Sequence, residues 1–186
     1  VSRYGVLPFA WSFDNAGPLT RTVEDSALTL SVIAGHDPKD PTSSKARVPN
    51  YVRGLRGGIR GLRIGLPKEW FFDVVDAEVE QGVRDGIRVL EGLGASTRQV
   101  TAPMVTHYLE IGNTITAAEG AAYHEEHMQR CPEKYGPFLL RRLHAGRLIS
   151  ATDYVKAQRL RRVLRTQFLQ ALAEVDVIVT PTTPIV

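Results

Sequence analysis

Apolar residues recur at two different spacings along the chain, and the spacings separate predicted helices from predicted strands. Between positions 76 and 94 they recur about every 3.6 residues, which indicates a helix with Asp76 as its N-cap. The segments 62–67 and 95–100 on either side are short, strand-like runs. A strand, a helix and a strand in this order predict a crossover unit with two parallel strands and a right-handed connection. The apolar residues of the helix are Val79, Val83, Ile87 and Leu90.

Two capping boxes mark the beginnings of further helices. Thr22 and Asp25 open a helix that is predicted to end at Gly35, because glycine takes a left-handed conformation without steric cost. Ser150 and Asp153 open a second, longer helix. This longer helix carries one continuous apolar stripe, which consists of Ala157, Leu160, Leu164, Phe168, Ala171 and Val175.

The remaining segments complete an α/β pattern. Helices are predicted over 104–128 and over 137–145, the second closed by Gly146. Residues 175–180 are mostly β-branched and nearly all apolar, which predicts a strand covered on both faces. The long segment 36–60 is rich in Pro, Gly, Ser and charge, and it is predicted to be a surface connection.

The composition is that of a soluble globular chain. Of its 186 residues, 43% are hydrophobic and 23% are charged, which is too apolar for a disordered protein. No apolar run approaches the roughly 18 residues that a membrane helix needs, and no signal-peptide pattern is recognised. The single cysteine, Cys131, excludes an internal disulfide and indicates a cytoplasmic protein. A formal net charge of +3 permits an anionic partner but does not require one.

None of the serines has the setting of a nucleophile. No serine lies in a G-x-S-x-G elbow or in an S-x-x-K arrangement. Several of them are placed for capping or turn roles, which need only a short side-chain oxygen. The sequence by itself therefore predicts no catalytic residue. The serines considered are Ser2, Ser12, Ser26, Ser31, Ser43, Ser44, Ser96 and Ser150.

His124, His127 and Cys131 are metal-ligand residue types that share one face of a predicted helix. The motif is H-E-E-H and not H-E-x-x-H, and no fourth ligand is evident. We therefore interpret these residues, with Glu125 and Glu126, as a partly exposed polar face, and we predict no metal.

Basic and glycine-rich segments do not indicate a nucleic-acid or nucleotide site. The arginines of the last long helix flank its apolar stripe, as the solvent side of a half-buried helix does, and no stacking aromatics are interleaved with them. Gly57, Gly58 and Gly61 match neither phosphate-loop pattern and precede a strand, so no cofactor is predicted. The basic residues are Lys156, Arg159, Arg161, Arg162 and Arg165.

Residues 2–44, SRYGVLPFAWSFDNAGPLTRTVEDSALTLSVIAGHDPKDPTSS, closely resemble a segment of the amidase signature family. In that family the pattern is S-R-x-G, then S-x-D-x-x-G-P-x-x-R-T-V-x-D, a helix, and A-G-x-D-x-x-D. The resemblance continues through LRIGLPKEWF and GLGASTRQV to the final DVIVTPTTPIV, and it is weakest over 101–149. The matching residues of the first segment are Ser12, Asp14, Gly17, Pro18, Arg21, Thr22, Val23, Asp25, Gly35, Asp37 and Asp40.

The resemblance implies an amidase fold, with a mixed sheet covered by helices and residues 1–186 forming the C-terminal part of one domain. Family members hydrolyse amide bonds, or transfer the released ammonia, with a Ser nucleophile, a cis-peptide Ser and a Lys. The family's G-G-S-S-G-G-S and G-S-x-x-G-G-S-[IV]-R stretches are absent from this sequence. We therefore expect all three catalytic residues to lie upstream of Val1, and we expect the chain alone to be inactive.

What the resemblance leaves to this chain is scaffold and substrate pocket. Asn113, Thr114 and Glu119 correspond to the place where a variable helix of the family approaches the substrate, and they are candidate substrate-binding residues; an internal polar pair is the alternative. Asp14, followed by Gly17 and Pro18, is expected to fix a turn. The expected partners are a small-molecule amide and the missing N-terminal half of the domain. A homo-oligomer is left open, and no membrane contact is expected.

Three hypotheses follow from the resemblance. The first is a fragment of a stand-alone amidase. The second is the A subunit of a glutamyl/aspartyl-tRNA amidotransferase, although the E-A-S-S-N-L-x-R-x-D-G stretch of those subunits is replaced here by EGAAYHEEH from Glu119 to His127. The third is a non-catalytic scaffold or a nucleic-acid-contact module that uses the Arg-rich helix. Unpaired apolar strands also predict that the isolated chain associates or aggregates.

Overall fold

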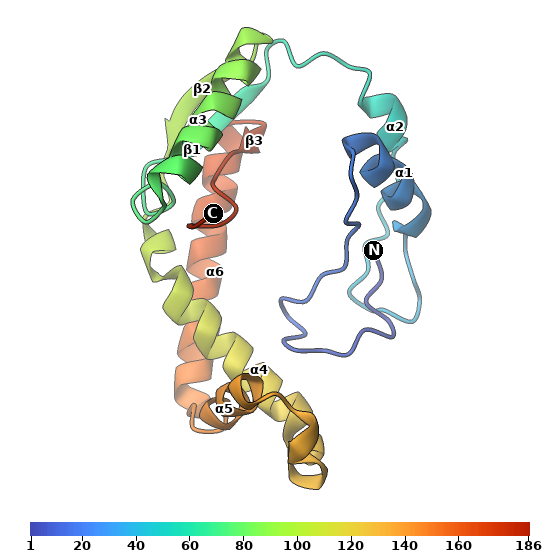
Figure 1. Cartoon of the computed structure of the whole chain (residues 1–186), viewed down its shortest axis with the longest axis vertical. Coiled ribbons are helices and arrows are strands. Elements are labelled where there is room, and N and C mark those ends of the chain that lie inside the picture. The colour runs from blue at the N-terminus through green and yellow to red at the C-terminus, as the bar shows by residue number, and fades with distance from the viewer. The chain divides into compact units, whose positions relative to one another are not determined.

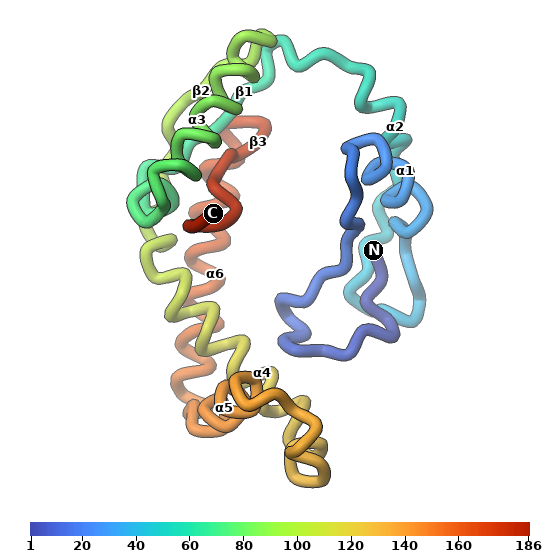
Figure 2. Tube along the Cα trace, viewed as in Figure 1, coloured from blue at the N-terminus to red at the C-terminus, as the bar shows by residue number.

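The computed structural model describes residues 1–186, and the chain divides into two compact units (Figures 1 and 2). The first unit contains Val1–Gly58 and Thr116–Leu148, and the second contains Ile59–Ile115 and Ile149–Val186. The long helix α4, Tyr108–Arg130, contributes residues to both. No helix combines the length and the apolar character that crossing a membrane requires.

A small parallel sheet is the centre of the second unit. Strands β1 (Arg63–Pro67), β2 (Ser96–Val100) and β3 (Val177–Ile178) lie in the order β2-β1-β3, and both pairings are parallel. Helix α3, Ala77–Gly92, connects β1 to β2. The predicted crossover unit and the α/β class are therefore confirmed, and every strand pair in this chain is parallel.

The central strand β1 is covered on both faces. Ile64 is fully buried, and a side chain at Gly65, which faces the other way, would approach a Val175 methyl group to 2.9 Å. Val175, Val100 and Ala171 form the core on that second face. The close contact with Val175 explains why a glycine is needed in the middle of the strand.

The prediction of a strand over 175–180 with both faces covered is wrong in part. Strand β3 is two residues long and lies at the edge of the sheet, and Val177 is 38% exposed. The apolar run extends beyond the strand because Val175 packs into the core as the C-cap of the preceding helix.

That preceding helix is α6, Ala151–Glu174, and it begins as the capping box predicts. The Ser150 hydroxyl accepts a hydrogen bond from the Asp153 amide at 3.0 Å. Ala157, Leu164 and Ala171 of the predicted stripe are buried, whereas Leu160 is 42% exposed. A short 3₁₀ helix η1, Pro103–His107, precedes α4 and packs against α6.

The first unit contains α1 (Val23–Ile33), α2 (Tyr51–Gly54), η2 (Pro132–Lys134) and α5 (Pro137–Gly146). The Thr22 hydroxyl caps α1 by accepting from the Asp25 amide at 3.1 Å, as predicted. Gly35 follows with φ 146°, which places it among the conformations that favour glycine. Asn50 caps α2 inside the segment that was expected to be only a surface connection.

Helix α5 ends at Gly146, as predicted, but not because Gly146 takes a left-handed conformation. It is the last residue of α5, it is buried, and its φ is not positive. A Cβ atom at this position would collide with the Ala117 carbonyl of α4. Gly146 is therefore needed for close packing of α5 on α4, which is a contact between segments that are distant in sequence.

Candidate functional site

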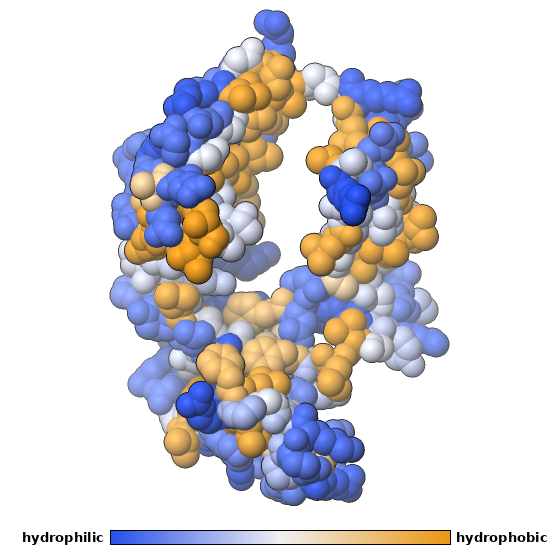
Figure 3. Space-filling model, viewed as in Figure 1, coloured by the Kyte–Doolittle hydropathy of each residue, from blue (hydrophilic) through white to orange (hydrophobic).

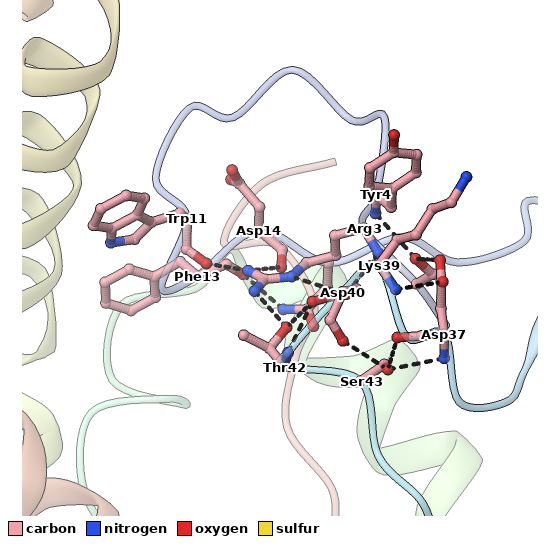
Figure 4. A network of polar contacts seen from close by, with 12 residues as sticks. Arg3, Tyr4, Trp11, Phe13, Asp14, Asp37, Lys39, Asp40, Thr42 and Ser43 are labelled. Carbon is pink, nitrogen blue, oxygen red and sulfur yellow. Dashed lines mark hydrogen bonds and ion pairs between the residues drawn. The ribbon is translucent and has the colours of Figure 1, made fainter.

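A network of polar contacts joins the first residues of the chain to the segment after α1 (Figure 4). Asp40, which is 5% exposed, accepts hydrogen bonds from the Arg3 amide at 2.9 Å, the Thr42 amide at 2.9 Å and the Thr42 hydroxyl at 2.6 Å. The Thr42 hydroxyl and the two amides lower the pKa of Asp40 to about 2. Asp40 is thus a carboxylate that satisfies backbone donors of two loops.

Arg3 and Ser2 hold the same network from the other side. The Arg3 guanidinium donates to the Trp11 carbonyl, to the Asp14 carbonyl at 3.3 Å and to the Thr42 hydroxyl at 2.6 Å. The Ser2 hydroxyl donates to Asp37 at 2.6 Å, and this bond lowers the pKa of the Asp37 carboxyl. The Ser2 hydroxyl thus helps to fix this loop, and its exclusion as a nucleophile stays a prediction.

Asp14 fixes a turn, but with residues that precede it in the sequence and not with the predicted Gly17 and Pro18, which follow it. Its carboxylate accepts from the Phe9 amide at 2.9 Å and from the Ala10 amide at 3.1 Å. No contact joins the carboxylate to Gly17 or Pro18. The prediction that Asp14 fixes a turn is therefore correct, but its partners are not, because a short carboxylate can reach backbone amides before or after it in the sequence.

Beside the network lies a hollow of about 260 Å³, and its side chains are mostly apolar or aromatic. At the rim of the hollow, the Lys39 ammonium lies 4.9 Å from the centre of the Tyr4 ring. The carboxylates of Asp14 and Asp40 already accept backbone hydrogen bonds. The hollow therefore offers apolar and aromatic side chains beside the cations of Arg3 and Lys39. Its lining consists of Arg3, Tyr4, Gly5, Val6, Pro8, Trp11, Asp14, Lys39, Asp40 and Pro41.

The three predicted substrate-binding residues do not share one unit. Asn113 is exposed and Thr114 is half-buried on the part of α4 that belongs to the second unit, where the Thr114 hydroxyl donates to the Glu110 carbonyl at 2.7 Å. Glu119 belongs to the first unit and is 8% exposed. Its carboxylate accepts from the Ser12 amide at 3.0 Å, so it ties the N-terminal segment to α4.

Thr114 lines a hollow of about 420 Å³ in the second unit, which lies between the η1–α4 segment and α6. Apolar side chains such as Ile111 and Ala157 are buried there, and charged side chains are exposed at its rim. On α6, the Lys156 ammonium lies 3.9 Å from a carboxylate oxygen of Asp153. Sequence reasoning missed this group because its members come from two helices. The lining is Met104, His107, Glu110, Ile111, Thr114, Asp153, Lys156, Ala157 and Leu160.

His124 is buried, which corrects its interpretation as part of an exposed polar face. One ring nitrogen, Nε2, lies 3.0 Å from the Pro8 carbonyl, and Nδ1 lies 2.9 Å from the Tyr135 hydroxyl. Since a carbonyl only accepts, Nε2 donates to Pro8, and Nδ1 is engaged by the Tyr135 hydroxyl. Burial raises the pKa of the Tyr135 hydroxyl, which keeps it protonated. His124 therefore fastens the N-terminal segment to α4, and neither ring nitrogen has a free lone pair for a metal.

The other two members of the suspected metal set do not join His124. The Cys131 thiol donates to the His127 carbonyl at 3.3 Å, and no group of three His, Cys, Asp or Glu side chains has the geometry to hold a metal ion. On α6, Arg159, Arg162 and Arg165 are exposed, as expected for the solvent side of that helix.

Comparison with known proteins gives one consistent result. A family model described as Amidase matches residues 1–186. An amidase of Pseudomonas putida is 44% identical over 185 residues, which is 100% of this chain and 40% of that protein. The A subunit of the glutamyl-tRNA(Gln) amidotransferase from Carboxydothermus hydrogenoformans is 39% identical over 208 residues, covering 99% of this chain and 43% of that protein.

A solved structure supports the same assignment at the level of the fold. It is described as an unexpected vestigial protein complex that reveals the evolutionary origins of an s-triazine catabolic enzyme. It matches with a TM-score of 0.90 and 34% identity, over 99% of this chain and 39% of that chain. The chain thus spans about two fifths of the length of these relatives. Because the family model matches throughout, the chain belongs to the amidase family.

Proposed function

We propose that this chain is the C-terminal part of an amidase whose intact form hydrolyses a carbon–nitrogen amide bond. The observation that carries the proposal is the family match over all 186 residues, together with a span of only 40% of the Pseudomonas putida amidase. The attacking Ser, the cis-peptide Ser and the Lys of the family have no counterpart motif in this sequence. In the proposed protein they belong to the remaining part of the domain, and this chain supplies scaffold and pocket walls.

The polar network around Asp40 fits a scaffold role. It fixes the backbone of Arg3 through a charged acceptor that is almost fully buried, so the direction of the chain at its first residues is held rigidly. In the family, the segment that matches Ser2 and Arg3 follows the serine-bearing stretch. A rigid Arg3 would therefore help to place that stretch.

The hollow in the second unit that Thr114 lines is proposed to contact the substrate. Thr114 lines it and Asn113 is exposed next to Thr114, so both can meet a ligand from the solvent side. Glu119 is proposed to act indirectly, because its carboxylate accepts from the Ser12 amide. The substrate class is a small amide.

Joining the missing part tests the proposal. The region of the Pseudomonas putida amidase that precedes its match would be fused to this chain, and ammonia release would be measured over a panel of amides. We expect release by the fusion, none by the chain alone, and none after replacement of the upstream nucleophilic serine by alanine. A fusion that folds cooperatively but releases no ammonia from any amide would refute the function.

A threonine pair tests the pocket. In the fusion, Thr114→Val should change KM and the preference between amides, because Thr114 lines the hollow. Thr166→Val is the matched control, since the Thr166 hydroxyl also donates to a helix carbonyl, that of Arg162 at 3.0 Å, but Thr166 does not line this hollow. Equal effects of the two substitutions would remove Thr114 from the proposed pocket.

A second candidate function is the A subunit of a glutamyl-tRNA amidotransferase, which would release ammonia from glutamine. It is favoured by the 39% identity to such a protein from Carboxydothermus hydrogenoformans. It is disfavoured by EGAAYHEEH from Glu119 to His127, where that class carries its E-A-S-S-N stretch. Glutamine-dependent ammonia release by the fusion, together with recovery of partner subunits, would favour this candidate over the stand-alone amidase.

We also propose that both compact units belong to a single amidase domain and that the protein is cytoplasmic. The first proposal is supported by the single family match across the unit boundaries, and the second by the use of only one cysteine, Cys131. Thermal unfolding of the fusion tests the single domain, and microscopy of a tagged copy tests the location. Separate melting of the two units or export of the tagged copy would contradict them.

A further inference from the structure

Helix α1 exposes far more apolar surface than it buries. Ala27 is its only buried residue, whereas Leu28 is 52% exposed and Val32 is 84% exposed. An isolated helix of 11 residues is marginally stable in water, so packing of an apolar face must supply most of its stability. The contacts of α1 in this chain therefore do not account for its stability.

Helix α2 packs against α1 but is too short to cover it. The two helices border a hollow of about 470 Å³, to which Leu28 and Val52 contribute apolar side chains. Arg53 and Arg56 stand exposed at its rim, and neither guanidinium forms an ion pair. Figure 3 shows hydrophobic and hydrophilic residues mixed over the α1–α2 region. We call Leu28, Val32, Val52, Arg53 and Arg56 the α1–α2 face.

We propose that the α1–α2 face binds a segment from the amino-terminal part of an amidase chain, one that presents apolar residues flanked by Asp or Glu. The relatives extend about two and a half times as far as this chain, so they contain a large body of polypeptide that can cover the face. Arg53 and Arg56, which form no ion pair in this chain, favour a segment whose apolar residues are flanked by acidic ones. The inference rests on the proposed function for its partner, but it does not depend on amide hydrolysis.

A second copy of this chain fits the face less well. In a two-fold dimer the same patch meets itself, so the interface would hold Arg53 and Arg56 of both copies and no acidic residue of the face to pair with them. Like charges brought together at an interface are repulsive. Charge complementarity therefore favours the amidase segment over self-association through this face.

Hydrogen exchange is the test that needs no activity. Deuterium uptake of α1 would be compared between the chain alone and its fusion to the upstream region of the Pseudomonas putida amidase. We expect fast uptake in the chain alone and strong protection of α1 in the fusion. Equal uptake in the two would overturn the inference. A fusion that is inactive but has a protected α1 would support the inference and contradict the proposed function. A fusion that is active but has an unprotected α1 would support the function and contradict the inference.

Co-expression in trans provides the second measurement. A tagged upstream region should capture the chain, and Leu28→Asp with Val32→Asp should weaken capture roughly tenfold or more, because an unpaired carboxylate would be buried. Arg53→Glu with Arg56→Glu should weaken it and reverse its salt dependence. Val89→Asp is the control, since Val89 is 62% exposed on α3, outside the face. Capture that survives the Leu28 and Val32 changes, or a dimer of the chain that these changes dissolve, would contradict the proposal.

Discussion

Two aspartates, one in each unit, have the same lowered pKa of about 2 but perform different tasks. In the first unit, Asp40 is 5% exposed and accepts from two loop amides and a hydroxyl. In the second unit, the Asp176 side chain is 40% exposed and forms a two-pronged pair with the Arg63 guanidinium at 2.8 and 3.2 Å. The side-chain bond from Arg63 is the main cause of the lowered pKa of Asp176.

The difference shows how each unit is held together. Around Asp40, no sheet or helix satisfies the loop amides, so the carboxylate replaces secondary structure. The Asp176 carboxylate also accepts one backbone amide, that of Arg63 at 2.8 Å, but it does so beside strands that are already paired, since the Asp176 amide donates to the Arg63 carbonyl at 2.9 Å next to the β1–β3 pairing. The first unit should therefore respond strongly to loss of single contacts, and the second weakly.

The largest expected effect comes from Gly146 in the first unit. Gly146→Leu should destabilise the fold by about 3 kcal/mol, because any side chain there collides with the Ala117 carbonyl and overpacking of a tight contact is costly. Urea unfolding and hydrogen exchange would measure the loss, which we expect in α5 and the facing turns of α4. The control is Gly86→Ala in α3, where no atom lies within 4 Å of an added Cβ. That substitution should stabilise the helix by about 1 kcal/mol. A harmless Gly146→Leu would show that the two helices can separate freely.

Asp40→Asn should have the next largest effect. The amide side chain keeps one acceptor oxygen and loses the charge, so the Arg3 and Thr42 amides lose part of their acceptor. We expect faster hydrogen exchange at these two amides and fraying of residues 1–14. The neighbouring Asp37→Asn should have a smaller effect, since Asp37 accepts from Ser2 and the Lys39 amide only. Unchanged exchange at Arg3 in Asp40→Asn would show that the network does not hold the loop.

What the sequence predicted well is what depends on neighbouring residues. The Thr22 and Ser150 caps involve partners three residues away, and both were found as predicted. The crossover around α3 was also correct, because a strand, a helix and a strand follow one another directly. Short-range spacing therefore determines these features almost completely.

What the sequence did not predict depends on residues that are far apart. His124 contacts the Pro8 carbonyl across 116 positions, and Glu119 contacts the Ser12 amide across 107. Helical spacing shows that such residues share a face, but it does not show which distant segment covers that face. The packing role of Gly146 was missed for the same reason, since it depends on Ala117 of another helix. The candidate site was affected most, because its walls come from separate helices.

Acid should destabilise the first unit through protonation of Asp40. The folded-state pKa of Asp40 is about 2, below its usual 3.8, so its stabilising effect is full above the usual value and is lost as the pH falls through 3.8 toward 2. We expect the Arg3 and Thr42 amide signals to shift and broaden over this range in wild type. In Asp40→Asn this change should be absent. A wild-type transition at these amides above pH 5 would indicate a different titrating group.

The smallest expected effect is that of Asp176→Asn, and it tests the other side of the comparison. The pair with Arg63 is exposed, so solvent and salt already screen it, and β1 keeps its pairing with β2 without it. Urea unfolding should show only a slight loss, and 0.5 M NaCl should reduce the difference from wild type, since the Debye length falls to a few ångströms. Glu174→Gln is the control, because Glu174 forms a somewhat more exposed pair with Arg98 at the same distance of 2.8 Å. If Asp176→Asn destabilised the chain as much as Asp40→Asn does, the second unit would depend on a polar clamp as well. The contrast between a loop held by a buried carboxylate and a sheet held by its own strands would then be lost.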